Sequence, residues 1–293
     1  MIKKSLLVAL VLLALYHFVF PRLPRNYYWI PGQQRANYLR AQQFVHDAPA
    51  DAKVVVGSSM SNELSQEVFG PGYVKLTFPA GGSFTGLDII AEAGKKPPMV
   101  LIESNTLLRD SDAGLLGDST SPWRRKLRDA SPIFKEEGRP SNFEVGFLNA
   151  QVKRVCSLTN KVLHGGRKPA PAAEKPLDPA VFADIMRVNR EGLDKTPVAE
   201  NLTTRTKRMG KIVDGLIASG TKCVFYEMPI DPSLKDLKEP AAIRAAMLER
   251  FPKDKYRWLE LDTARAWKTT DGIHLSRAEA DEVTATLAAA TKE

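Results

Sequence analysis

The chain has 293 residues, 43% of them hydrophobic and 26% charged, with a formal net charge of +8. This is ordinary for a globular protein with a full core, arranged as one large α/β domain or two smaller ones. The positive charge raises nucleic acid, acidic polysaccharide or anionic lipid as partners, but the Lys and Arg residues are scattered. No zinc pattern or RNA-binding signature accompanies the densest basic cluster, at 124–128. We therefore expect no nucleic-acid binding.

The N-terminus carries an uncharged apolar run. Residues 5–20 contain no charge, and Lys3 and Lys4 precede them. Sixteen helical residues span roughly 24 Å, which is short of the ~30 Å hydrocarbon core but close with interfacial flanks. The run has no small-residue cleavage site, and the aromatic residues 27–29 follow it as an interfacial belt would. We expect an uncleaved single-pass anchor over 1–25 with its N-terminus inside. The alternative is an apolar helix packed on the domain.

Strand and helix patterns then alternate along the chain. Short β-branched runs bounded by turn residues predict buried strands, and apolar residues at helical spacing predict the helices between them. A lead-in helix over 33–45, in a segment 26–52, joins the anchor to a domain over 53–293. The first three strands are predicted at 53–57, 73–78 and 98–103, with helices at 61–69 and 84–94. Strands separated by single helices predict a parallel βαβαβ unit.

The pattern weakens after residue 107. We interpret 107–178 as an insertion beside the sheet, with a helix within 142–163 and a flexible Pro/Ala/Lys segment at 165–176. The α/β pattern then resumes, with strands predicted at 222–227 and 256–261 and helices at 179–193, 200–219, 240–251 and 276–290. Ser276 and Glu279 form a predicted capping box. Cys156 and Cys223 either pair or leave Cys223 as a buried thiol in its strand.

A serine-rich turn follows the first strand. Gly57 ends the strand, and Ser58, Ser59 and Ser61 lie where a helix begins. One of these serines can serve as an N-cap. The functional reading is that one hydroxyl is held at the carboxyl edge of a parallel sheet, beside helix amides that favour developing negative charge.

Three further pieces fall at the same edge or in the loop before the last helix: Gly81-Gly82, Asn105, and Asp271 with His274. Neutral imidazole suits proton removal from a serine near pH 7, and a carboxylate three residues ahead can orient it. Backbone and amide donors suit an oxyanion. Each piece also has an ordinary explanation. Asn105 can cap a turn, the glycines can permit positive φ, and Asp271-Gly272 can be a simple turn.

In order and spacing, these pieces resemble the SGNH, or GDSL-type, hydrolase and acyltransferase superfamily. The match is most specific at Asp271-Gly-Ile-His-Leu-Ser276. The resemblance implies Ser59 as nucleophile, Asp271 and His274 as its partners, and Gly82 and Asn105 as oxyanion donors, with Gly81 the alternative to Gly82. Two blocks depart from the family pattern. Ser58 replaces the Asp of Gly-Asp-Ser-Leu, and Glu103-Ser104-Asn105-Thr106 replaces Gly-x-Asn-Asp.

The resemblance also implies a fold and a function. We expect a three-layer α/β/α sandwich with a mainly parallel, doubly wound sheet, and ester chemistry through a Ser59-acyl intermediate without metal or cofactor. Single-anchor members of this superfamily imply O-acetyl transfer to, or removal from, an extracytoplasmic polysaccharide. They also imply a multi-spanning membrane acyltransferase as partner and an inner-membrane location with the domain facing the periplasm or exterior. Transfer is favoured over hydrolysis by a small margin. The rival is a catalytically silent glycan-binding or scaffold module.

Overall fold

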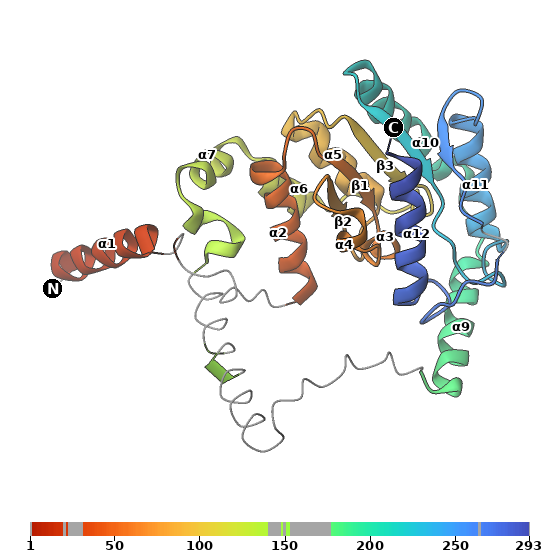
Figure 1. The fold of residues 1–293 in the computed structure, drawn as a ribbon, viewed down its shortest axis with the longest axis horizontal. Helices are drawn as coiled ribbons and strands as arrows, with labels where there is room; N and C mark the ends of the chain where they lie inside the picture. The colour runs from red at the N-terminus through yellow and green to blue at the C-terminus, as the bar shows by residue number, and fades with distance from the viewer. Residues whose placement is uncertain are drawn as a thin grey trace. The chain divides into compact units, whose positions relative to one another are not determined.

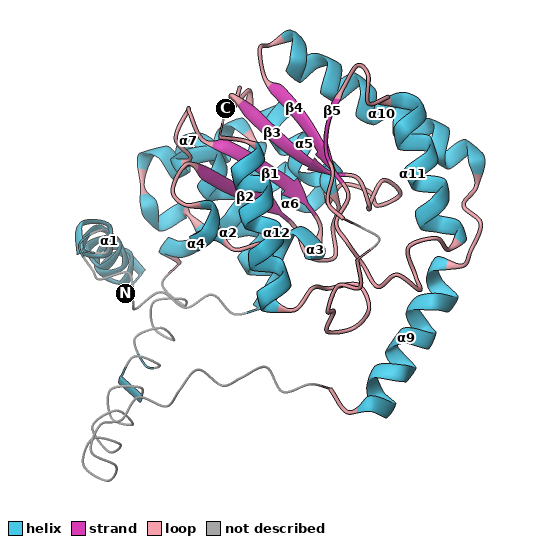
Figure 2. Cartoon of the chain, turned by 45° about the vertical axis from the view of Figure 1, so that its right-hand side comes forward, coloured by secondary structure: helices cyan, strands magenta, loops and turns pink. Residues whose placement is uncertain are grey.

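The computed structural model describes residues 2–19, 22, 32–139, 148, 151–152, 177–262 and 265–292. Its contacts divide the chain into two compact units, Met1–His46 with Asp118–Lys175, and Asp47–Gly117 with Pro176–Glu293. Figure 1 labels helices of both units and the strands β1, β2 and β3, and Figure 2 also labels β4 and β5. Several expectations lie outside the described residues: the aromatic belt at 27–29, Cys156, the segment 165–176 and, except for residues 148 and 151–152, the helix within 142–163.

The second unit is built on a five-stranded sheet in the order β2-β1-β3-β4-β5. Every neighbouring pair of strands is parallel. The strands are β1 (Lys53–Gly57), β2 (Tyr73–Thr77), β3 (Met99–Glu103), β4 (Lys222–Tyr226) and β5 (Arg257–Leu259). The predicted α/β class and the doubly wound parallel sheet are therefore confirmed. In this strand order the direction of winding reverses between β1 and β3, where ligands of such sheets bind.

Helices cover both faces of the sheet (Figures 1 and 2). On one face α5 (Ser83–Ala93) packs against β1 and β2, and α10 (Ala199–Ala218) packs against β4 and α11 (Lys238–Arg250). On the other, α12 (Arg277–Ala290) joins a core that includes Val55, Leu101 and Val224. The inner strands are buried on both faces, which is why β1 and β3 are continuous apolar runs rather than alternating ones.

Two local predictions are wrong in detail. The single helix expected over 61–69 is two short ones, α3 (Ser59–Asn62) and α4 (Gln66–Phe69), because Ser65 begins a new helix by accepting a hydrogen bond from the Val68 amide. Ser276 does occupy the N-cap position of α12, but its side chain makes no capping bond. The Glu279 carboxylate binds Arg265 instead, at 2.8 Å, so the expected capping box does not form.

The first unit contains the predicted lead-in helix, α2 (Gly32–Asp47), together with α7 (Pro122–Ala130) and two single 3-10 turns, Pro132–Phe134 and Glu136–Gly138. The side chain of Gln42 donates to Asp118 at 3.1 Å and accepts from the Glu136 amide at 2.7 Å. These bonds tie α2 to the chain that follows residue 117. Two of the boundaries between the units fall within helices, one before the last residue of α2 and one in α6 (Ala113–Thr120).

The N-terminal helix α1 (Ile2–Val19) belongs to the first unit. It has 18 residues with a mean hydropathy of 1.8, and none of them is buried. By length and composition, α1 is able to cross a membrane.

Candidate active site

The serine-rich turn lies at the carboxyl end of β1, where α3 begins. Ser58 is the N-cap, because its Oγ accepts a hydrogen bond from the Met60 amide at 3.2 Å. Ser58 and Ser61 are both fully buried, whereas Ser59 is only half-buried. Of the three serines, Ser59 alone is placed to meet a substrate. The N-cap role thus belongs to Ser58, and the partly accessible side chain belongs to Ser59.

Ser59 meets the residues predicted from the far end of the chain. Its Oγ lies 2.8 Å from His274 Nε2, and His274 Nδ1 lies 2.6 Å from Asp271 Oδ2. With the proton on Nδ1 donated to Asp271, Nε2 is left to accept the Ser59 hydroxyl. The three side chains therefore form a continuous Ser–His–Asp chain of hydrogen bonds.

The electrostatics of this chain follow from its bonds. The hydrogen bond to Asp271 raises the pKa of His274 above its ordinary 6.5, although burial works against this. Burial alone would raise the pKa of Asp271, but hydrogen bonds from the His274 ring and from the amides of His274 and Ile273 outweigh it and lower that pKa. Asp271 is thus held as a carboxylate, and it makes His274 a better proton acceptor.

The loop that carries Asp271 is supported by residues that the sequence pattern did not single out. Asn189 on α9 (Pro179–Leu193) donates to the Asp271 carbonyl at 2.8 Å. Gly272 has φ of +88°, and a Cβ there would collide with the sulfur of Met186, also on α9. The Asp271-Gly272 turn expected as the ordinary explanation therefore exists, and it is part of what aims the carboxylate. No sequence motif identifies Asn189, because its side chain binds the backbone carbonyl of Asp271, a group that every residue has.

A second buried carboxylate, from Glu103 at the end of β3, lies under the serine turn. Its Oε2 accepts from the Ser58 amide at 2.9 Å and from the Ser61 amide at 3.3 Å, and its Oε1 accepts from Ser58 Oγ at 2.7 Å. The Ser61 hydroxyl also binds Oε2 and meets the hydroxyl of Tyr226 at 2.7 Å. Glu103 is 0% exposed. Sequence reasoning missed this role, since it treated Glu103 only as a departure from a family pattern.

Tyr226 completes the cluster from β4. Burial raises its pKa well above the ordinary value, and the negative charge of Glu103 acts in the same direction. The phenol therefore remains protonated and donates to Ser61, whose own hydroxyl points to Glu103. Gly57 makes this approach feasible, because a Cβ there would lie 2.5 Å from both Glu103 Oε2 and Ser61 Oγ.

The two predicted oxyanion residues occupy different settings. Gly82 is the buried N-cap of α5, with φ of −145°, so the positive φ considered for the glycine pair is absent. A Cβ on Gly82 would lie 3.0–3.1 Å from Thr106 and Arg109, which is close enough to explain a glycine there. Asn105 binds the backbone of Met228 on both sides, with Oδ1 accepting at 2.7 Å and Nδ2 donating at 3.0 Å. No bond from its second Nδ2 hydrogen is found among the described residues, so this hydrogen can donate to a ligand.

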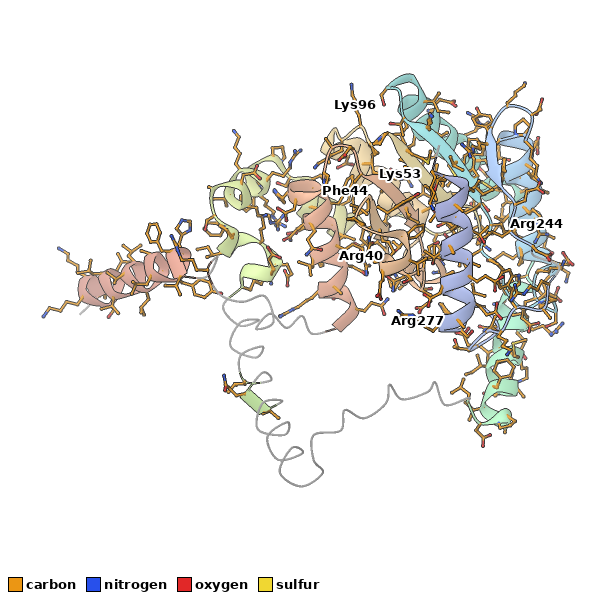
Figure 3. All side chains as sticks on the ribbon, in the orientation of Figure 1. Arg40, Phe44, Lys53, Lys96, Arg244 and Arg277 are labelled. Carbon is orange, nitrogen blue, oxygen red and sulfur yellow. The ribbon has the colours of Figure 1, made fainter. Side chains whose placement is uncertain are left out.

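A pocket of about 90 Å³ adjoins these groups. It is lined by Asn105 and by Met60 and Ile273, the chain neighbours of Ser59 and His274. Its apolar wall comes from residues of four segments: Leu108, Leu193, Ile230, Pro240 and Ile243. Arg244, labelled on α11 in Figure 3, binds the Glu227 carboxylate at 2.7 and 2.9 Å, so the two charges satisfy each other at the pocket margin.

Cys223 is a free, buried thiol, and burial raises its pKa to about 12. It takes no part in the site.

The chain matches no protein-family model, and a comparison with curated proteins finds no relative. Membership of the SGNH superfamily therefore stays a prediction from the motifs. The geometry above defines a Ser–His–Asp site at the switch point of a parallel sheet.

Proposed function

We propose that Ser59 performs acyl-ester chemistry through a covalent acyl-serine. The observation that carries this proposal is the pair of hydrogen bonds linking Ser59 to His274 and His274 to Asp271, at 2.8 and 2.6 Å. A serine hydroxyl is a weak nucleophile until a base takes its proton, and here the base and its orienting carboxylate are in place.

The steps follow from these contacts. Ser59 Oγ attacks the ester carbonyl carbon while its proton passes to His274 Nε2. The bond from carbon to the alcohol oxygen breaks, and His274 returns the proton to that oxygen. A water or sugar hydroxyl then gives its proton to His274 and attacks the acyl-serine. When the second intermediate collapses, Ser59 regains its proton.

The developing oxyanion needs fixed donors, and three are proposed: the Ser59 amide, the Gly82 amide and the Asn105 side chain. The Ser59 and Gly82 amides have no hydrogen-bond partner within the described part of the chain. The acyl group would lie in the pocket beside Asn105. The apolar wall of this pocket suits an apolar acyl chain.

The test is acyl-ester turnover and labelling by a fluorophosphonate, which reacts with activated serines. Ser59→Ala should abolish both, whereas the matched control Ser276→Ala, at a position whose hydroxyl makes no capping bond, should retain both. Activity that survives Ser59→Ala but is lost in Ser58→Ala or Ser61→Ala would overturn the choice of nucleophile. Absence of any turnover or labelling in the wild-type chain would favour the silent glycan-binding or scaffold module.

We further propose that this protein lies in the inner membrane. Its substrate would be an extracytoplasmic polysaccharide, to which it adds O-acetyl groups or from which it removes them. In this proposal α1 is the anchor, the domain faces the periplasm or exterior, and a multi-spanning acyltransferase supplies the acyl group. The anchor would raise the effective concentration of such a donor. Leu108 and Arg109, from the start of the predicted insertion, line the pocket and help to restrain water, which favours transfer.

Two measurements decide these points. An activated acetyl ester is supplied with and without candidate glycans, and both acetate and acetylated glycan are followed. Acetate release at one rate in all cases, with no acetylated glycan, would leave an esterase. For topology, a reporter fused after Glu293 should be active only in its extracytoplasmic form, and a shortened soluble product would show cleavage instead of anchoring.

A further inference from the structure

Glu103 is a buried carboxylate that the steps above do not use. It is 0% exposed, and the part of the chain described by the structure places no Lys, Arg or His in an ion pair with it. Removing a carboxylate from water is costly unless hydrogen bonds replace the lost hydration. Here the replacement donors come mainly from the serine turn, so the carboxylate and the turn depend on each other.

The bonds to Glu103 lie on either side of the nucleophile. The Ser58 amide precedes Ser59 and the Ser61 amide follows it, and both donate to Glu103 Oε2. The Met60 amide is taken by Ser58 Oγ, whose own hydroxyl donates to Glu103 Oε1. Of the four amides from 58 to 61, only that of Ser59 is left to face the reacting carbonyl. A helix of four residues has little rigidity of its own, so these bonds define the direction of that amide.

We propose that Glu103 is a positioning residue, which fixes the Ser59 hydroxyl and amide by holding the backbone on both sides of them. This rests on the proposed function of Ser59. The role of Glu103 also links the two places where this sequence departs from the SGNH pattern, Ser58 and the block that begins at Glu103. A carboxylate is missing at position 58 and present at position 103, and the two side chains hydrogen-bond directly at 2.7 Å. The carboxylate under the turn is supplied by β3.

Three substitutions separate geometry from charge. In Glu103→Gln, the amide oxygen still accepts from both backbone amides, and the NH₂ group donates to the Ser58 hydroxyl, which can accept as well as donate. Glu103→Asp keeps the negative charge but shortens the side chain by one methylene group, which moves the carboxylate away from the serine turn. Glu103→Ala removes every bond. We expect kcat to stay within about tenfold of wild type in Glu103→Gln, to fall further in Glu103→Asp, and to fall by about 10²-fold or more in Glu103→Ala.

The split between kinetic constants distinguishes positioning from general destabilisation. KM should change less than about threefold in all three variants, because Glu103 itself does not line the pocket, and thermal unfolding is measured alongside. The matched control is Glu136→Ala, because Glu136 is also a buried glutamate but belongs to the first unit, whereas the triad residues belong to the second. It should lose stability without losing kcat. Full kcat in Glu103→Ala, or a higher kcat in Glu103→Asp than in Glu103→Gln, would overturn the proposal.

Amide hydrogen exchange tests Glu103 without any turnover. In a Ser59→Ala background, the amides of residues 58 and 61 should be protected, and adding Glu103→Ala should release them while the amides of β4 stay protected. Unchanged protection at 58 and 61 would overturn the positioning role, even if the chain with Ser59 intact is an active enzyme. If Glu103→Ala removes this protection but the wild-type chain turns over no ester, the role of Glu103 in holding the turn is supported. Only the proposed function of Ser59 is then contradicted.

Discussion

The two halves of the triad are built in opposite ways. The Asp271–His274 loop makes its bonds over three residues, with the Asp271 carboxylate accepting from the backbone and ring of His274. The Gly57–Ser61 turn instead depends on side chains 42 to 165 residues away, from Glu103 and Tyr226. The loop is therefore a local unit, which receives one further bond from Asn189 of α9. The turn, in contrast, reaches its geometry only after β1, β3 and β4 have assembled. Substitutions should affect the two halves differently.

Apart from the loss of Ser59 itself, the largest effect is expected from Asp271→Asn. Loss of the carboxylate removes the orientation of His274, and kcat/KM should fall by about 10³- to 10⁴-fold. His274 must be neutral to accept the Ser59 proton, so activity falls on the acid side as its pKa is crossed. Because Asp271 raises that pKa above 6.5, the acid limb of wild type should lie above 6.5 and should move to lower pH in Asp271→Asn. A pH–rate profile measures both, and an unmoved limb would contradict this role.

Asn105→Ala should have the next largest effect. Asn105 belongs to the part of the site that is held by contacts between residues far apart in the sequence. If Nδ2 donates to the oxyanion, kcat should fall by about 10²- to 10³-fold with little change in KM. The same substitution leaves the Met228 amide and carbonyl without their partners, so unfolding should also become easier by about 1–3 kcal/mol. Steady-state kinetics and thermal unfolding separate the two effects. Loss of stability with full kcat would leave Asn105 as a link between β3 and β4 only.

Asn105 and Glu103 also show how far the sequence carries. Strand positions and the order of the α/β elements were predictable, because apolar runs and turn residues report burial directly. The pairing of Asp271 with His274 was predictable because the resemblance implies it and a carboxylate three residues ahead of a histidine can reach its ring. The bonds of Asn105 to Met228, and of Glu103 to the serine turn, join residues 42 to 123 positions apart. No local pattern encodes such distances, so these contacts had to come from the structure.

Gly57→Ala tests how tightly the turn is packed. The added methyl would lie 2.5 Å from Glu103 Oε2 and Ser61 Oγ, so the turn must shift or the carboxylate must leave its donors. Overpacking of this kind typically costs about 1–3 kcal/mol. We expect a lower melting temperature and a lower kcat together. Gly192→Ala in α9, where a methyl meets nothing within 4 Å, is the control and should melt no lower than wild type.

The smallest effect is expected from Asn189→Ala, which removes a single bond to the Asp271 carbonyl. One such hydrogen bond contributes about 0.5–1.5 kcal/mol, so kcat/KM should fall by only about two- to thirteenfold. The loop keeps its internal bonds, and the pH profile should keep its shape. A loss as large as that of Asp271→Asn would show that the loop is not a local unit and depends on α9.

The sequence separation of the triad has a consequence for the newly made chain. Ser59 precedes His274 by 215 residues. At synthesis rates of about 5–20 residues per second, the serine exists for roughly 10–40 s before its base has been made. The base reaches it only once the loop before α12 is in place, and α12 itself is held beside the serine turn by a hydrogen bond from the Ser65 amide to Thr284. Until that loop is in place Ser59 is therefore an ordinary alcohol, and a chain truncated before Asp271 carries a serine without its base.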